Sequence, residues 1–368
     1  MIYLDNNQQA FFELLRAGLW EKKARLSTLE AIDIKDIYRI AEEQSVIGLV
    51  AAGLEHLKEV RVAKEDVLQI VGQALQLEQR NKAMNEYVAS LIKRLRDEEV
   101  YAILVKGQGI AQCYERPLWR ASGDIDLLLS DTNYEKAKKM LVPLAVDAEN
   151  EYKTFKHLGL TMQGGFVVEL HGTLHSRLSK RVDSVIDEAH NDVFHGGCVR
   201  SWKNGKTTVF LPAPDDDVIF IFTHILHHYY IEGIGLRQIC DWCRLLWTYR
   251  SEIDVKLLEK RLRKAGLMSE WMAFAALAVD WLGMPVEAMP LYSSEKKWSR
   301  KAKRILAFVL ECGNFGHNRQ TSSSGKLNSL CLKTKDFANH MRVFPIDSVK
   351  FFWYFLWNGI GIVLTKDK

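Results

Sequence analysis

The sequence lacks any strong excess of one charge. Its 368 residues include 50 Lys and Arg against 46 Asp and Glu, which gives a formal net charge of +4. A total so close to neutral does not support nucleic acid or a membrane surface as a partner, although nucleic acid stays possible. Partners must therefore be inferred from local groups of residues.

Cysteines are also few, and they are not arranged as a disulfide framework. Only six occur in the chain, whereas disulfide-stabilised domains are dense in cysteine. We expect reduced thiols and no disulfide. Cys240 and Cys243 have the spacing of a redox motif, but they lie inside a helical pattern rather than at a helix start, which argues against a redox role.

A secretory signal and a long apolar run are both missing. The first residues have neither the basic segment nor the apolar run of a signal peptide, so we expect a cytoplasmic protein. The apolar run at residues 351–364 is shorter than the ~20 residues of a membrane-spanning helix, and no span is expected. A packed core segment is the first interpretation of this run. A partner-binding segment headed by Phe351, Phe352 and Trp353 stays open.

Helical periodicity is present at both ends of the chain, and a different pattern fills the middle. Apolar residues recur every three or four positions from Gln8 to about Arg96 and again after Pro214. Between these regions, short β-favouring runs cover residues 100–105, 124–130, 154–162 and 166–171, with a Gly-Gly hairpin turn between the last two. The patterns predict an α+β fold with a small mixed α/β core at 98–211, flanked by helical regions at 1–97 and 212–368.

An acidic pair in the second of these strands indicates the chemistry. Residues two apart in a strand point to the same face, so Asp124 and Asp126 present adjacent carboxylates. Their repulsion is offset best by a hard divalent cation with oxygen ligands, such as Mg²⁺. Glu169 interrupts a later apolar strand, which makes it the candidate third ligand. Asp124, Asp126 and Glu169 are therefore the candidate metal-binding and catalytic residues.

A glycine turn precedes the acidic pair and is typical of a phosphate contact. Residues 105–109 combine a strand end, two glycines that permit close backbone approach, and the start of a helix. Arg120 adds positive charge, and His171 shares the strand face of Glu169; a ribose or phosphate contact and plain packing are both open for His171. The candidate contacts for a nucleoside triphosphate are Lys106, Gly107, Gln108, Gly109, Arg120 and His171.

For three other groups of residues, a structural role is favoured over a functional one. His224, His227 and His228 lack the Glu of a His-Glu-x-x-His site, so a core or substrate-facing role is favoured over a metal site. Residues 215–217 are three aspartates that follow a proline, which is typical of a helix start. The basic stretch 296–304 is interpreted as a solvated helix face, with nucleic acid or an acidic acceptor as the alternative.

The segments 104–107, 120–128 and 168–171 resemble the bacterial family of uncharacterised nucleotidyltransferases, within the DNA polymerase beta-like nucleotidyltransferase superfamily. The resemblance implies an Mg²⁺-dependent enzyme in which an acceptor hydroxyl attacks the α-phosphorus of a nucleoside triphosphate and pyrophosphate leaves. It also implies two metal ions, with Asp124 and Asp126 at the phosphates and Glu169 at the acceptor side. The acceptor, whether small molecule, sugar, peptide or protein, is not identified.

One departure from the family pattern supports an alternative function. Many superfamily members have Ser after the turn glycine, where this chain has Gln108. A nucleotide-binding regulatory or antitoxin-like module without turnover therefore stays open. So does a helical scaffold that binds a partner through residues 351–357.

Overall fold

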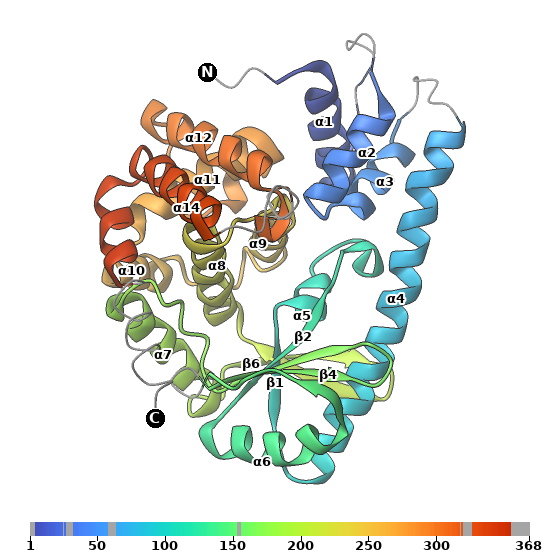
Figure 1. The fold of residues 1–368 in the computed structure, drawn as a ribbon, viewed down its shortest axis with the longest axis vertical. Coiled ribbons are helices and arrows are strands. Elements are labelled where there is room, and N and C mark those ends of the chain that lie inside the picture. Colours follow the sequence, from blue (N-terminus) through green and yellow to red (C-terminus); the bar gives the residue numbers. More distant parts are fainter. Residues whose placement is uncertain are drawn as a thin grey trace.

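In the described residues, seven strands form one mixed sheet, which lies in the lower half of the molecule in Figure 1. The computed structural model describes residues 4–24, 26, 32–57, 64–152, 156–316, 318 and 326–354. The strand order is β3-β4-β5-β2-β1-β7-β6; β2 is parallel to β5 and β1 to β7, whereas the other neighbours are antiparallel. The strands are β1 Ala102–Val105, β2 Asp124–Leu129, β3 Ala145–Ala148, β4 His157–Met162, β5 Val167–His171, β6 Val199–Asn204 and β7 Thr207–Pro212.

Helices precede and follow the strands along the chain, which confirms the predicted α+β fold. The N-terminal helices are α1 Asn6–Trp20, α2 Ile34–Glu43, α3 Ile47–Glu55 and α4 Lys64–Asp97. Within the sheet region lie α5 Gly107–Ala111, α6 Asp131–Leu141 and α7 Lys180–Phe194. The C-terminal helices are α8 Pro214–Ile231, α9 Leu236–Thr248, α10 Val255–Ala265, α11 Met268–Leu282, α12 Lys296–Cys312 and α14 Lys326–Met341, and residues 345–354 are also helical.

The sequence prediction missed β3, β6, β7 and α7. The strands β3 and β6 are the two edges of the sheet, and none of their residues is fully buried. An edge strand with little buried surface has no apolar alternation by which it can be recognised. Helix α5 begins at Gly107, within the glycine turn itself, and Ser130 is the N-cap of α6.

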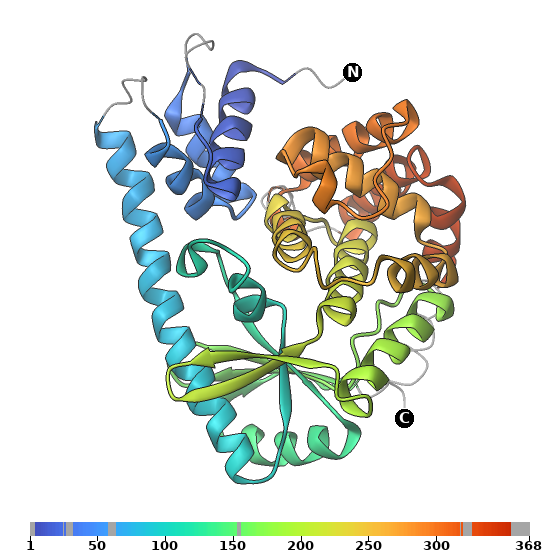
Figure 2. The same ribbon diagram turned by 180° about the vertical axis from the view of Figure 1, so that it is seen from behind.

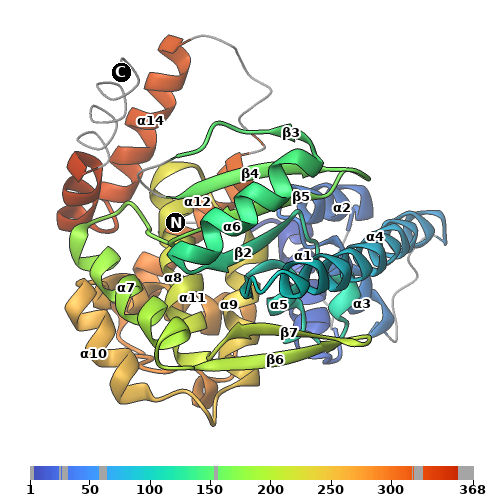
Figure 3. The same ribbon diagram turned by 90° about the horizontal axis from the view of Figure 1, so that it is seen from below.

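The lower face of the sheet packs on α4 and α6. The buried side chains of Ile125, Leu127 and Leu129 point to this face, as the alternation in β2 predicts for the first two. Figure 3 shows α6 lying across the sheet; it contacts β2 and β5, and α4 contacts β6 and β7. With this face filled by apolar side chains, the other positions of each strand face the remaining helices.

Above the sheet lie α1–α3 and the C-terminal helices, and these two groups pack on each other (Figures 1 and 2). One apolar cluster joins residues of α1, α3, α8, α9, α11 and α12 with Ile103, Val105 and Leu128 of the sheet. The indole of Trp20 donates to the carbonyl of Leu282 over 2.6 Å. The N-terminal and C-terminal helices therefore form a shared layer above the sheet, and the domain limits at residues 97 and 211 stay a prediction.

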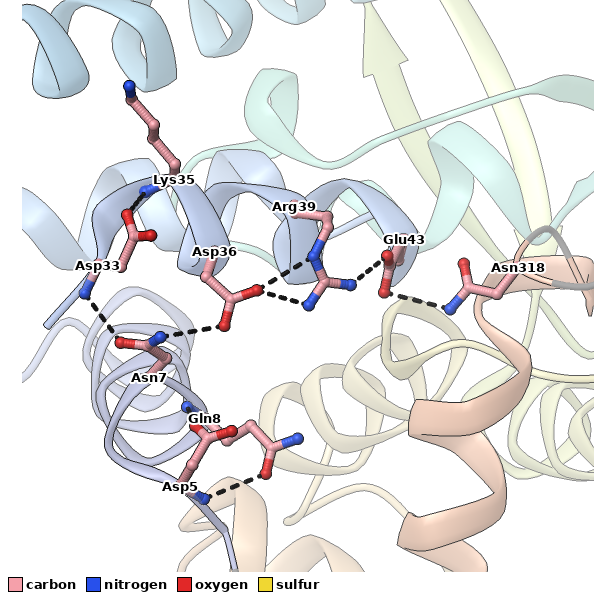
Figure 4. Close-up of polar contacts among 9 residues, drawn as sticks. All are labelled: Asp5, Asn7, Gln8, Asp33, Lys35, Asp36, Arg39, Glu43 and Asn318. Atoms are coloured by element: carbon pink, nitrogen blue, oxygen red, sulfur yellow. Dashed lines mark hydrogen bonds and ion pairs between the residues drawn. The ribbon is translucent and has the colours of Figure 1, made fainter.

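Polar contacts at the surface connect the same two regions (Figure 4). Asn7 of α1 donates to Asp36 of α2 over 3.1 Å and accepts from the backbone N–H of Asp33 over 2.8 Å. At the end of α2, Glu43 accepts from the side-chain amide of Asn318 over 3.1 Å. These contacts link α1 and α2 to a residue that follows α12.

Three expectations about the chain as a whole can be compared with these elements. None of the helices in the described ranges combines the length and the apolar character that a membrane span requires. Cys113, Cys198, Cys240, Cys243 and Cys312 are free thiols. At the C-terminal apolar run, Phe351 is buried and Trp353 is exposed, and residues 355–364 lie outside the described part.

Candidate functional site

A cavity of about 460 Å³ lies between the upper face of the sheet and helices α8 and α9. Its floor comes from the ends of β1, β2, β5 and β4, and its walls come from α8, α9 and the segment 173–177. Of the predicted site residues, seven line it: Lys106, Gly107, Arg120, Asp124, Asp126, Glu169 and His171.

The three acidic residues meet on the floor of this cavity. In the parallel pairing of β2 with β5, Asp126 is the direct register partner of Glu169, and Asp124 lies two residues earlier on the same face. One carboxylate oxygen of each residue lies within 4.8 Å of the others. The register of β2 with β5 thus brings Glu169 together with two aspartates that lie 43 and 45 positions earlier in the sequence.

The pKa values of these acids reflect their crowding. The charge of Asp126, followed by burial, raises the pKa of Asp124. Burial would also raise the pKa of Asp126, but Lys106 and His171 outweigh it and hold that pKa below its ordinary value. Glu169 likewise has a lowered pKa, because hydrogen bonds from two imidazoles overcome the effect of burial. The cluster therefore carries negative charge that only nearby cations balance.

Lys106 supplies one of these cations. Its ammonium Nζ lies 2.9 Å from Oδ1 of Asp126. Burial alone would lower the pKa of Lys106, but the three carboxylates outweigh burial and raise it. The backbone of Lys106 has a φ of 55°, which is unusual for a residue with a side chain. This conformation directs the chain from β1 into α5 directly beside the acids.

The residues of the glycine turn are not equivalent. Gly107 lines the cavity with a φ of +34°, and a Cβ there would lie 3.2 Å from the carbonyl oxygen of Asp124. Gly109 instead packs against Leu211 of β7. The buried side chain of Gln108 donates to Oδ1 of Asn81 in α4 over 3.1 Å. Neither Gln108 nor Gly109 is among the cavity-lining residues.

Arg120 lies at the α9 end of the cavity and is engaged with protein groups. Its guanidinium donates to both carboxylate oxygens of Asp241, over 2.9 and 2.6 Å, and to the hydroxyl of Ser122 over 2.9 Å. Tyr114 donates to the same carboxylate over 2.7 Å. Burial opposes the charge of Arg120, but the pairing with Asp241 outweighs it and raises the pKa of Arg120. This buried network holds α9 against the segment that precedes β2.

Two imidazoles adjoin the acids. Nε2 of His171 lies 2.9 Å from Oδ1 of Asp126 and 3.2 Å from Oε2 of Glu169. His157, which sequence reasoning missed, lies directly opposite His171 in the β4–β5 hairpin, with Nε2 3.3 Å from Oε2 of Glu169. The signal was available, because the hairpin turn at residues 164–165 implies this pairing.

Helices α8 and α9 also contribute side chains to the cavity. His224, His227 and His228 line the cavity, and they are not among the metal-ligand groups found in the described ranges. Burial, reinforced by the charge of Lys106, lowers the pKa of His224 well below its ordinary value, so this imidazole is neutral. Arg237 of α9 also lines the cavity and donates to the carbonyl of Ala121 over 2.9 Å.

The remaining groups singled out in the sequence lie outside the cavity. The aspartates at 215–217 occupy the first turn of α8, where Asp216 pairs with Arg261 and Asp217 with Arg200. The basic stretch forms the first half of α12 and is largely exposed.

Comparison with known proteins gives one match. Residues 30–283 match the model of a family described as uncharacterised nucleotidyltransferase. This span covers more than half of the chain and contains every residue that lines the cavity. No curated protein and no solved structure is significantly similar to the chain.

Proposed function

Because the chain belongs to the uncharacterised nucleotidyltransferase family, and is thus an enzyme of nucleotidyl transfer, we propose that it uses Mg²⁺ and a nucleoside triphosphate. An acceptor hydroxyl would attack the α-phosphorus, the bond to the β-phosphate oxygen would break, and pyrophosphate would leave. The proposal includes a cytoplasmic location, where nucleoside triphosphates are supplied.

The observation that carries this proposal is the convergence of three carboxylates on the cavity floor. All three donors are hard oxygen atoms, and Asp126 together with burial raises the pKa of Asp124 despite the opposing charges of Lys106 and Arg237, which is consistent with room for a further cation. Such a donor set fits Mg²⁺, which binds through a few carboxylates together with substrate phosphates. When bound, the ion would neutralise charge on the transferred phosphate.

The order of the strands supports separate positions for the two substrates on the floor. Lys106 and Gly107 lie at the end of β1, and Glu169 lies on β5, with the aspartates of β2 between them. We therefore place the triphosphate on the β1 side, where the ammonium of Lys106 and the backbone of Gly107 would bind its oxygens. The acceptor would enter on the β5 side, where Glu169 would orient its hydroxyl or accept its proton.

The size and polarity of the cavity suit this arrangement. A volume of about 460 Å³ falls in the usual range for small-molecule sites. Phe220, Ile221 and Ile225 of α8 form an apolar part of the wall, whereas Arg177 and Glu232 make the acceptor side polar. A polar acceptor that carries a hydroxyl group is consistent with these walls.

Calorimetry tests the proposal directly. Titration of ATP, GTP, CTP and UTP in the presence of Mg²⁺ is expected to give binding heat with at least one nucleotide. Asp126→Asn removes a central carboxylate and is expected to abolish pyrophosphate release and to weaken Mg²⁺-dependent binding at least about tenfold. Absence of binding heat with all four nucleotides would contradict the proposed function.

Gln108 favours a second candidate, a nucleotide-binding module without turnover. Its amide is bound to Asn81, so it offers no hydroxyl to a phosphate at the position where many superfamily members have Ser. This alternative predicts nucleotide binding that survives Asp126→Asn, together with no release of pyrophosphate from the wild-type protein with any acceptor.

A further inference from the structure

Two histidines and one glutamate form a second group of possible metal ligands beside the three acids. His157, Glu169 and His171 each offer one ligand atom, and these atoms lie within 4.8 Å of one another. Both imidazoles direct Nε2 at the same carboxylate oxygen, Oε2 of Glu169, over 3.3 and 3.2 Å. All three residues line the cavity.

The sheet holds this group in place. His157 and His171 are cross-strand partners in the β4–β5 hairpin, and their ring centroids lie 4.8 Å apart. Glu169 is two residues before His171 and therefore lies on the same face of β5. His171 is buried, and His157 and Glu169 are partly buried, so neither imidazole is a loosely held surface group.

The two separations between Oε2 of Glu169 and the imidazole nitrogens are close to those around a small ion with tetrahedral coordination. With metal–ligand bonds of about 2.0–2.1 Å, neighbouring ligand atoms of a tetrahedral site lie roughly 3.3–3.4 Å apart. An octahedral Mg²⁺ site would bring neighbouring ligands to roughly 3.0 Å and would favour oxygen over nitrogen. Two imidazole nitrogens with one carboxylate are the ligands preferred by Zn²⁺ and related transition metals.

We propose that His157, Glu169 and His171 bind a transition-metal ion of the Zn²⁺ class, adjacent to the Mg²⁺ site and sharing Glu169 with it. Three protein ligands leave a fourth position, which faces the cavity and is available to a substrate oxygen. Asp126 lies 2.9 Å from the same His171 nitrogen, so the two ion positions are neighbours. The two ions implied by the family resemblance would then differ in kind, one held by oxygen donors and one mainly by nitrogen.

The position of this ion suggests its task. It lies toward β4, on the side of Glu169 that is remote from Lys106 and Gly107. In the proposed reaction this is the acceptor side, where the ion would lower the pKa of the attacking hydroxyl. That task rests on the proposed function, whereas the presence of the ion does not.

Cobalt is a suitable probe because tetrahedral Co²⁺ absorbs visible light far more strongly than octahedral Co²⁺. The full-length chain, freed of metal with a chelator, is titrated with Co²⁺ in the presence of excess Mg²⁺. We expect one Co²⁺ per chain with intense visible absorption, which Zn²⁺ displaces and Mg²⁺ does not. A weak spectrum, or one that Mg²⁺ removes, would overturn the proposal from the wild-type protein alone.

Variants then locate the ion. His157→Ala is expected to weaken Co²⁺ binding at least about 100-fold. His175→Ala is the matched control, since His175 lines the same cavity but is bonded to Asp187 over 2.6 Å, and it is expected to retain the ion. Asp124→Asn should also retain it. Loss of the spectrum in Asp124→Asn, with retention in His157→Ala, would place the ion among the carboxylates and refute the assignment.

The same titrations separate this inference from the proposed function. Nucleotide binding and pyrophosphate release are measured with Mg²⁺ on the same samples. Nucleotide binding without the Co²⁺ spectrum would refute the nitrogen site alone, and the spectrum without nucleotide binding would refute the nucleotidyl transfer alone.

Discussion

At the scale of single residues, the site depends on a balance between three acids and the cations beside them. Asp126 is almost fully buried, yet its pKa is held low because Lys106 and His171 both contact it. Removing the partner of a buried charge lowers the stability of the fold, and a new counter-ion beside that charge restores part of the lost stability. In the absence of metal, the stability of the folded protein should therefore depend on both Lys106 and His171.

Lys106→Met tests this balance. The substitution leaves Asp126 without its ammonium, and we expect the free energy of unfolding to fall by about 3 kcal/mol, the lower end for a broken buried ion pair, because His171 remains. Added Mg²⁺ should restore part of the loss. Denaturant unfolding with and without Mg²⁺ measures both effects. Lys136→Met, at an exposed position of α6, is the control and should change stability by less than about 0.5 kcal/mol.

A second residue far from the cavity makes stability depend on pH. Glu270 of α11 is fully buried and accepts a hydrogen bond from Tyr230 over 3.1 Å. Burial, reinforced by the charge of Asp347, raises the pKa of Glu270 to about 8. The unfolded chain releases this proton near pH 4.5, so the folded state binds more protons between these two values. The contribution of Glu270 therefore makes the free energy of unfolding fall as the pH rises from about 4.5 to about 8.

Glu270→Gln should remove that dependence. We expect the variant to be more stable than the wild type by about 1–3 kcal/mol at pH 7 and to show no difference near pH 4.5. Urea unfolding across this range measures the difference. Glu287→Gln, at an exposed position, is the control and should leave the dependence of the unfolding free energy on pH unchanged. The assignment would be contradicted if the unfolding free energy of the wild type rose from pH 5 to pH 8 and that of Glu270→Gln ran parallel to it.

At the scale of elements, a close backbone contact holds α1 against α3. A Cβ at Gly18 would lie 1.9 Å from the carbonyl oxygen of Leu49, and one at Gly53 would lie 2.1 Å from the carbonyl oxygen of Leu14. The two backbones approach so closely that only glycine fits at either position. Gly72 of α4 is the opposite case, because nothing lies within 4 Å of a Cβ there.

Gly18→Ala and Gly72→Ala should consequently have opposite effects. The first forces two backbones apart and should lower the free energy of unfolding by about 3 kcal/mol or more. The second adds a methyl group in open space within a helix and should raise it by about 0.5–1 kcal/mol. Thermal melts of both variants check this contrast, and equal effects would show that α1 and α3 are not packed as described.

At the scale of the whole molecule, the cavity is built from parts of the chain that are far apart in sequence. Its floor belongs to the sheet, its walls belong to α8 and α9, and the N-terminal helices share an apolar cluster with both. A ligand bound there would contact two of the three predicted regions at once. Binding should therefore stabilise the sheet and the C-terminal helices together.

Calorimetric unfolding tests this coupling. With Mg²⁺ and a non-hydrolysable triphosphate at about 100 times its Kd, the sheet and the C-terminal helices should unfold in one transition, stabilised by about 2.7 kcal/mol. The Asp126→Asn variant should show little of this shift. Separate transitions for residues 98–211 and 212–368, with only one of them moved by the ligand, would instead support independent units.

Local pattern was sufficient to predict the acids and most of the elements around them. The period of two in β2 places Asp124 and Asp126 on one face, and the period of 3.6 identified the helices at both ends. These periodicities depend only on residues that are close in sequence, so they can be recognised from a single sequence. The same local reasoning identified Glu169 as an acid in an apolar strand, but it did not supply the pairing with Asp126.

Only the tertiary structure decided which side chains share the cavity. The register of β2 with β5 and of β5 with β4 brings Asp126, Glu169 and His157 together, and the packing of α8 adds His224. Tertiary packing also turned Gln108 toward Asn81, away from the cavity. Contacts of this kind join residues tens of positions apart, and the free energy of burying the whole core selects them, so no local pattern of the chain records them.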